Sequence, residues 1–181
     1  RADGRKRSDA CENQTVRLYG EISAQGISSA RQEEFFLLKN TEPPVIVCCM
    51  TILAVSISVQ TADQARTQIV QAAREGAEAV ELRTDFMHSL DPSIVTELVR
   101  FAHEQNVSVL VTCRDRAQGG AGDWPTEKRI EILTAALDAG AEFADCEFSH
   151  YVRDSVQSQL REALQRNPKA RLILSAHDFS G

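Results

Sequence analysis

The sequence predicts an α/β fold in which parallel strands alternate with helices. Three observations predict it: apolar runs of strand length alternate with amphipathic segments of helix length, glycine follows two of the helical segments, and polar side chains gather where strands end. The length of 181 residues suits one domain. A net charge of −6 and the lack of a basic stripe argue against a nucleic-acid partner.

The regular pattern begins near residue 50, and its elements can be placed in order. Strands are expected at 52–59, 77–85, 108–114, 142–148 and 171–177, and helices at 63–75, 92–105, 126–139 and 155–165. The first strand is apolar almost throughout, which is typical of a strand covered on both faces. The first helix has Thr61 or Asp63 as its cap and ends at Gly76, and the second begins with Pro92.

A repeated segment indicates how the units are spaced. Glu-Gly-Ala-Glu-Ala at 75–79 recurs as Ala-Gly-Ala-Glu-Phe at 139–143, so Gly76 and Gly140 lie 64 residues apart with one βα unit between them. About 32 residues per unit fits a (β/α)8 barrel of the TIM type, whose eight units take ~250 residues, so this chain would hold about five units. A doubly wound sheet stays open on spacing alone. Polar residues at the carboxyl ends of strands favour the barrel.

Residues 1–49 differ from the predicted domain at 50–181. They carry no net charge, show little periodicity and are followed by a regular pattern that starts beside Met50, so we expect an irregular extension. The apolar run at 45–59 is shorter than the ~20 residues of a membrane span, and no membrane association is expected. The five cysteines form no CxxC pair, which argues against a metal site or disulfide frame and favours a reducing, cytoplasmic location.

Polar side chains at the strand ends are the candidate site. Glu81 and Arg83 share one face of the second strand, because residues two apart point the same way. Such a pair is either a structural ion pair or the floor of a polar binding site. Arg114 ends the third strand and is suited to a carboxylate, or is a surface charge. His177 follows the fifth strand and is suited to proton transfer, or is structural.

The other reactive side chains have plainer interpretations. Cys113 is expected to pack in the core rather than act as a nucleophile. His88, His103 and His150 fall in loop or helix contexts and are expected at the surface. The glycine-rich loop at 118–122 lacks the spacing of a phosphate-binding motif.

Five short motifs follow one another along the predicted strands. They are Ala54-Val55-Ser56, Glu81-Leu82-Arg83 with Asp85, Thr112-Cys113-Arg114 before Gly119-Gly120, Asp145-Cys146-Glu147, and Ser175-Ala176-His177-Asp178-Phe179. In this order they resemble the type I 3-dehydroquinate dehydratases, over residues 52–181. The resemblance implies a (β/α)8 barrel that converts a small-molecule substrate, 3-dehydroquinate, to 3-dehydroshikimate in the shikimate pathway. It implies no metal or organic cofactor, since a lysine of the family forms a Schiff base with the substrate ketone.

The resemblance also assigns roles residue by residue. His177 matches the proton-transferring histidine of the family, and four positions match substrate-binding residues: Ser56, Glu81, Arg83 and Arg114. Gln118 stands where the family usually has a glutamate near the histidine. An amide can orient an imidazole by hydrogen bonding, but it adds no charge to stabilise an imidazolium.

The lysine of the family follows the histidine strand, beyond Gly181. The four lysines present are not expected at strand ends, so we expect the chain alone to be inactive: Lys6, Lys39, Lys128 and Lys169. Two alternatives stay open, a non-catalytic truncated barrel that at most binds a carboxylated polyol, and another Schiff-base lyase such as an aldolase relative. The open edge of a five-stranded sheet predicts poor stability or association, for example as a homodimer.

Overall fold

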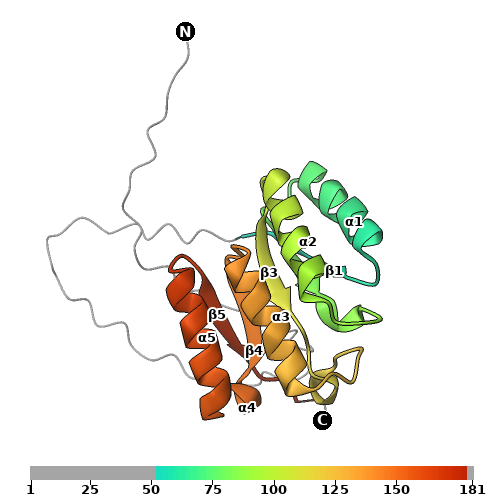
Figure 1. Ribbon diagram of the computed structural model, residues 1–181. Helices are drawn as coiled ribbons and strands as arrows, with labels where there is room; N and C mark the ends of the chain where they lie inside the picture. The colour runs from blue at the N-terminus through green and yellow to red at the C-terminus, as the bar shows by residue number, and fades with distance from the viewer. Residues whose placement is uncertain (1–51, 179–181) are drawn as a thin grey trace, which may run out of the picture. The chain divides into compact units, whose positions relative to one another are not determined.

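The computed structural model describes residues 52–178, which form a parallel sheet with helices along one face (Figure 1). The strands are β1 (Ala54–Ser58), β2 (Ala79–Arg83), β3 (Ser108–Thr112), β4 (Phe143–Glu147) and β5 (Arg171–Ser175). The helices are α1 (Ala62–Arg74), α2 (Pro92–Glu104), α3 (Thr126–Asp138), α4 (Phe148–Tyr151) and α5 (Asp154–Arg166), with 3-10 turns η1 (Thr84–Phe86) and η2 (Arg116–Gln118). Every predicted strand and helix is present, whereas α4, η1 and η2 were not predicted.

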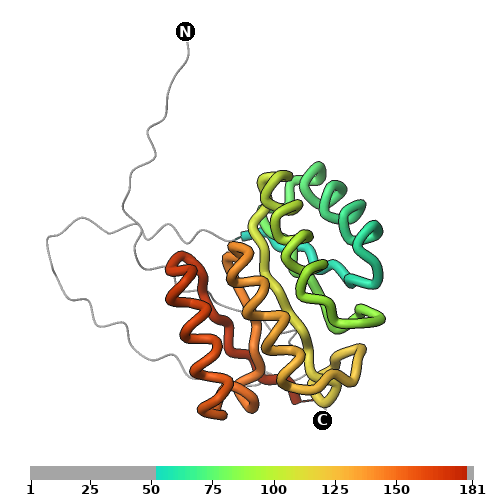
Figure 2. The backbone as a smooth tube through the Cα atoms, in the orientation of Figure 1, coloured from blue at the N-terminus to red at the C-terminus, as the bar shows by residue number. Residues whose placement is uncertain are grey.

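The order of the strands decides between the two α/β architectures. The sheet runs β1-β2-β3-β4-β5 and all neighbouring strands are parallel. The helices between them, α1, α2, α3 and α5, pack side by side on one face of the sheet, as the tube in Figure 2 also shows. A doubly wound sheet reverses its strand order and has helices on both faces. The doubly wound alternative is therefore excluded, and the predicted barrel type is confirmed for these five strands.

The hydrophobic core lies between the helices and the sheet. Alternate strand residues that point toward the helices are fully buried, namely Val80, Leu82, Val109 and Val111. The helices contribute fully buried residues from their inner faces, among them Ile69, Leu98, Ile132 and Leu160. Each such side chain contributes about 1.5–3 kcal/mol through burial. This packing fixes the strands, so the opposite face of the sheet is free to carry polar residues.

The two repeated glycines close helices. Gly76 and Gly140 have φ angles of 89° and 107°, which L side chains rarely adopt, and Asn106 takes the corresponding place after α2 with φ 61°. The amide after each of them returns to the helix, as when Ala77 N donates to Ala72 O at 3.0 Å. The resulting turn satisfies carbonyl groups at the end of the helix.

The glutamates of the repeat fasten neighbouring strands. Glu78 Oε2 accepts a hydrogen bond from Leu53 N at 2.9 Å, and Glu142 Oε2 accepts one from Val109 N at 2.8 Å. Both bonds lie at the amino-terminal ends of the strands. Residues at that end of a barrel serve stability, whereas those at the carboxyl end serve chemistry. The repeat therefore marks a structural device rather than part of the site.

One prediction about the strands is wrong. The first strand was expected to be covered on both faces, but within β1 only Ile57 is buried, and Val55 is 39% exposed. The reason is position: β1 pairs only with β2 and is an edge of the sheet that residues 52–178 form. An apolar run therefore did not distinguish an edge strand from a central one.

Several predictions fall on residues that the structure does not describe. The extension at 1–49, three of the cysteines, Lys6 and Lys39 lie outside residues 52–178. Cys113 and Cys146 are described, and both are free and buried. Burial raises the pKa of each thiol to about 12, so Cys113 is a core residue as predicted. Among the described helices none has the length and apolar character that crossing a membrane requires.

Candidate active site at the carboxyl ends of the strands

The face of the sheet opposite the helices carries the predicted site residues. The register pairs Ser56 with Glu81 across β1 and β2, and Arg83 with Thr112 across β2 and β3. Asp145 pairs in turn with Thr112. Residues paired in adjacent parallel strands point to the same side of the sheet. The polar side chains of β1 to β4 thus lie on one side of the sheet, toward the carboxyl ends of the strands, and form its polar face.

Arg83 pairs with Asp85 rather than with Glu81. Its Nε and Nη2 each donate to one oxygen of Asp85, both at 2.8 Å, and its guanidinium lies 5.1 Å from the centre of the Phe86 ring. Asp85 is 1% exposed. Burial alone would raise the pKa of Asp85, but hydrogen bonds from Arg83 and from the backbone amides of Ala121 and Arg114 outweigh it, so the pKa lies below its usual value.

Glu81 and Ser56 are less buried than Asp85 and Arg114. Glu81 is partly exposed, and its Oε1 accepts a hydrogen bond from Thr112 Oγ1 at 2.7 Å. Ser56 lies beside it on the exposed strand β1. The carboxylate and the hydroxyl thus share one side of the polar face, where both are suited to hydrogen-bonding hydroxyl groups of a ligand.

Arg114 is buried, so the alternative interpretation of this residue as a surface charge is wrong. It is 8% exposed, and its Nη1 donates to Ser175 Oγ at 2.6 Å and to Glu147 Oε1 at 3.3 Å. The same nitrogen lies 2.9 Å from Asp145 Oδ1, which also accepts a hydrogen bond from Ser175 at 2.7 Å. Burial raises the pKa of the Asp145 carboxyl, against the opposing effect of Arg114 and Ser175. Arg114 therefore follows the end of β3 and is held in place by side chains of β4 and β5.

A second buried arginine, which the sequence analysis missed, stands behind this group. Arg129 of α3 is 3% exposed, and its Nη1 donates to Glu147 Oε2 at 2.8 Å. Its Nη2 donates to Asp115 Oδ2 at 3.0 Å. Periodicity placed this residue on a helix, and no sequence signal distinguished it from a surface arginine.

The expected surface position of His150 is wrong. The side chain is 12% exposed, and Nε2 lies 2.5 Å from Asp115 Oδ2 and 2.9 Å from Arg129 Nη2. His150 belongs to α4, the short helix that was not predicted, and α4 brings it against the end of β3. His88 is exposed as predicted, and His103 is partly exposed and contacts Glu142 at 3.2 Å.

Gln118 connects the third strand to the histidine segment. Its Oε1 accepts a hydrogen bond from the backbone N–H of His177 at 3.0 Å, and its Nε2 donates to Ser149 Oγ at 3.1 Å. His177 follows β5 by two residues, and Ser175 at the end of β5 contacts Arg114. The amide of Gln118 therefore positions the backbone of His177, whereas an effect on the imidazole ring stays a prediction.

The glycine-rich loop packs tightly over the same strand ends. Ala121 N donates to Asp85 Oδ2 at 2.9 Å, and Trp124 Nε1 donates to Asp85 O at 3.2 Å. A Cβ on Gly120 would lie 2.1 Å from Arg114 O. Glycine is thus needed here for a close approach of two backbone segments.

Replacing Gly120 by alanine is expected to displace the end of β3 and to lower the free energy of unfolding by about 1–3 kcal/mol. The matched control is Gly76→Ala, where a Cβ meets open space but φ is 89°. The control should destabilise the fold without weakening ligand binding, because Gly76 lies at the opposite end of the strands. Urea unfolding and the Kd of a carboxylate ligand separate the two effects, and equal Kd values for both variants would contradict this account.

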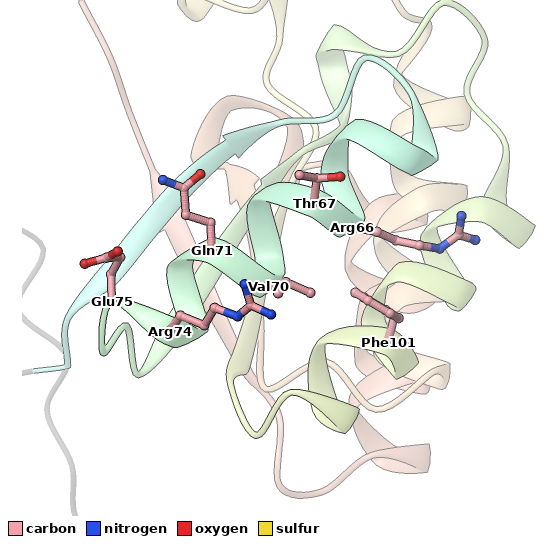
Figure 3. A pocket seen from close by; sticks show the side chains of 7 residues that line it. All are labelled: Arg66, Thr67, Val70, Gln71, Arg74, Glu75 and Phe101. Carbon is pink, nitrogen blue, oxygen red and sulfur yellow. The ribbon is translucent and has the colours of Figure 1, made fainter.

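A shallow hollow on the helix layer is separate from these residues. It is lined by side chains of α1 from Arg66 to Arg74, by Glu75 just after that helix, and by Phe101 of α2 (Figure 3). Figure 3 shows these side chains on and just after α1 and on α2, and none of the predicted site residues lines the hollow. The candidate site is therefore the polar face at the strand ends and not this hollow.

Comparison with known proteins shows which family the chain belongs to. The family model for type I 3-dehydroquinase matches residues 53–181. The chain belongs to the type I 3-dehydroquinase family. The match includes every strand described above, so the polar face belongs to a 3-dehydroquinase domain.

Individual 3-dehydroquinases are similar over part of their length. The chain is 32% identical over 113 residues to a 3-dehydroquinate dehydratase of Methanosarcina acetivorans, a match covering 61% of this chain and 46% of that protein. It is 28% identical over 110 residues to one from Coxiella burnetii, covering 61% and 42%. The chain therefore spans less than half the length of these curated relatives.

A solved structure shows the same fold. The 3-dehydroquinate dehydratase of Enterococcus faecalis superposes with a TM-score of 0.62 at 23% identity, over 76% of this chain and 60% of that one. At this identity the likeness concerns the fold. It confirms that the five strands correspond to part of the barrel of a 3-dehydroquinase.

Proposed function

We propose that the protein containing this chain converts 3-dehydroquinate to 3-dehydroshikimate and water, a step of the shikimate pathway. The family supports this reaction, and so does the similarity to 3-dehydroquinate dehydratases of Methanosarcina acetivorans and Coxiella burnetii. One geometric observation carries the proposal. Arg114 contacts Ser175, two residues before His177, so a buried guanidinium and the segment of a histidine lie together at the carboxyl ends of β3 and β5.

The proposed roles follow from the chemistry of each side chain. Arg83 and Arg114 attract the substrate carboxylate, since a guanidinium binds carboxylates through paired N–H groups. Ser56 and Glu81 hydrogen-bond the ring hydroxyl groups. His177 transfers protons, and Gln118 positions it. Three of the six residues lie in β1 and β2, and the other three lie past strand ends: Arg114 two residues after β3, Gln118 in η2, and His177 two residues after β5.

The proposed reaction passes through an imine between a lysine and the substrate ketone, formed with loss of water. The imine is the electron sink that acidifies the adjacent C–H bond, and His177 takes that proton. The resulting enamine expels the hydroxyl group, which receives the proton from His177 and leaves as water. Hydrolysis of the product imine then regenerates the lysine, so the net change is loss of one water.

The lysine of this proposal is neither of those that the structure describes. Lys128 lies on α3 and pairs with Glu131 at 2.8 Å, and Lys169 lies in the turn between α5 and β5. Neither stands at the carboxyl end of a strand. We therefore place the imine-forming lysine on a strand that follows residue 181 in the intact protein, and we expect no turnover by the 181-residue chain alone.

Reduction with borohydride tests the proposal. The intact protein is incubated with 3-dehydroquinate and sodium borohydride, and its mass should increase by one reduced substrate adduct. Turnover without the reductant should yield the conjugated enone, detected by ultraviolet absorbance. An adduct with aldol substrates but none with 3-dehydroquinate would favour an aldolase relative instead. Binding of a carboxylated polyol without adduct or turnover would favour a non-catalytic barrel.

A further inference from the structure

A buried guanidinium that the proposed reaction does not use lies behind Arg114. Arg129 contacts Glu147 and Asp115 through its two terminal nitrogens. Its Nε is buried and has no hydrogen-bond partner among residues 52–178. Burying a guanidinium is unfavourable, and replacing a whole buried ion pair by apolar side chains of similar volume is often neutral or stabilising. Stability alone therefore does not account for an arginine here.

Glu147 connects Arg129 to Arg114. It is 2% exposed, and its two oxygens accept hydrogen bonds from different arginines, Oε1 from Arg114 at 3.3 Å and Oε2 from Arg129 at 2.8 Å. Asp145 approaches Arg114 at 2.9 Å as well. Without Arg129, two buried carboxylates would face the single charge of Arg114. Like charges at such distances in a protein interior interact strongly, so the site would then repel an anion.

We infer that Arg129 is a positioning residue that offsets the charge of Glu147 and thereby preserves the attraction of Arg114 for a carboxylate ligand. The inference rests on the proposed function, because it takes Arg114 as a substrate-binding residue. Arg129 acts through Glu147 and not by touching the ligand. Its removal therefore weakens the binding of anions selectively and leaves the binding of uncharged ligands nearly unchanged.

Two probes that differ in charge test this selectivity in the intact protein. Quinate is a cyclic polyol with a carboxylate, and its methyl ester is the uncharged counterpart. Arg129→Gln is expected to raise the Kd of quinate about tenfold and to change that of the ester by less than about twofold. Arg129→Lys retains the charge and should retain quinate binding. Arg166→Gln is the matched surface control, because Arg166 pairs with Asp138 on the exposed side of α5, and it should change neither Kd.

A double variant separates charge from packing. Arg129→Gln combined with Glu147→Gln removes both charges, so quinate binding should recover to within about threefold of the original protein. Equal weakening of both probes by Arg129→Gln would overturn the inference, as would a double variant that binds quinate no better than Arg129→Gln. If thermal unfolding shows that Arg129→Gln does not fold, the quinate Kd of the double variant is compared with that of Arg129→Lys. A tenfold difference between these two Kd values would overturn the inference.

The proposed function can fail separately from this inference. Turnover of 3-dehydroquinate by the original protein, with equal loss of both probes in Arg129→Gln, would overturn the role of Arg129 alone. An original protein that neither turns over 3-dehydroquinate nor binds either probe would overturn both.

Discussion

Replacing His177 by alanine is expected to lower kcat for 3-dehydroquinate by about 10²–10⁴-fold in the intact protein. The reason is that the proposed reaction needs one group to remove a proton from carbon and to return it to the departing hydroxyl. The imine should still form, because it joins the lysine to the substrate ketone and does not include His177. Borohydride reduction should therefore trap the substrate on the His177→Ala protein while steady-state turnover is lost.

His103→Ala is the matched control for this variant. His103 contacts Glu142 at 3.2 Å beside the amino-terminal ends of the strands, far from the proposed chemistry. The control should keep its kcat and KM even if it unfolds at a lower temperature. An undiminished kcat in His177→Ala, or equal losses in both variants, would remove His177 from the mechanism.

The sequence predicted the fold well because the fold depends on local signals. Alternating apolar runs and helix-closing residues such as Gly76 and Gly140 act within one unit of the chain, so their effect can be predicted without knowing the partners. The burial of β1 could not be predicted in this way. Whether an apolar strand is covered depends on its neighbours in space, and Val55 is exposed because β1 lies at the edge of the described sheet.

The placement of the candidate site residues at one edge of the sheet could be predicted, but their pairings could not. Parallel strands bring their carboxyl ends to one edge, so Glu81, Arg83 and Arg114 could be placed together. The partner of each charge depends on distances of a few ångströms. Arg83 therefore pairs with Asp85, and Arg129 reaches Glu147 from a helix whose rotation no local pattern fixes to that accuracy.

Substituting Asp85 by asparagine is expected to lower the free energy of unfolding by about 2–4 kcal/mol at pH 7. Asparagine has the same size, but it removes the negative charge that pairs with Arg83. In the original protein both oxygens of Asp85 accept hydrogen bonds, whereas asparagine offers one oxygen and one N–H₂ group, which cannot accept. The donors of these hydrogen bonds are the guanidinium of Arg83 and the amides of Arg114 and Ala121. Because Asp85 joins the end of β2 to the glycine-rich loop and to the end of β3, the variant should also weaken carboxylate binding.

The same substitution predicts a change in pH dependence. The pKa of Asp85 is lower in the folded protein than its usual value of 3.8, because the hydrogen bonds from Arg83 and two amides outweigh burial. The stabilisation is therefore complete above that value and is lost as the pH falls through the lower, folded pKa. The difference between the original protein and Asp85→Asn should be constant from pH 7 to about 5 and shrink below about 4.

Asp138→Asn is the control, because Asp138 forms an ion pair of nearly the same geometry as that of Asp85 but at the surface. Asp138 accepts from Arg166 Nε at 2.8 Å and Nη2 at 3.0 Å, nearly the same pair of bonds that Asp85 accepts from Arg83, but both side chains are about half exposed. Solvent screens such a pair, so its loss should not be measurable in urea unfolding. If Asp85→Asn lowered the free energy of unfolding no more than Asp138→Asn does, burial would not be the cause of the stronger effect expected for Asp85. The carboxylate of Asp85 would then not be what holds the ends of β2 and β3 and the glycine-rich loop together.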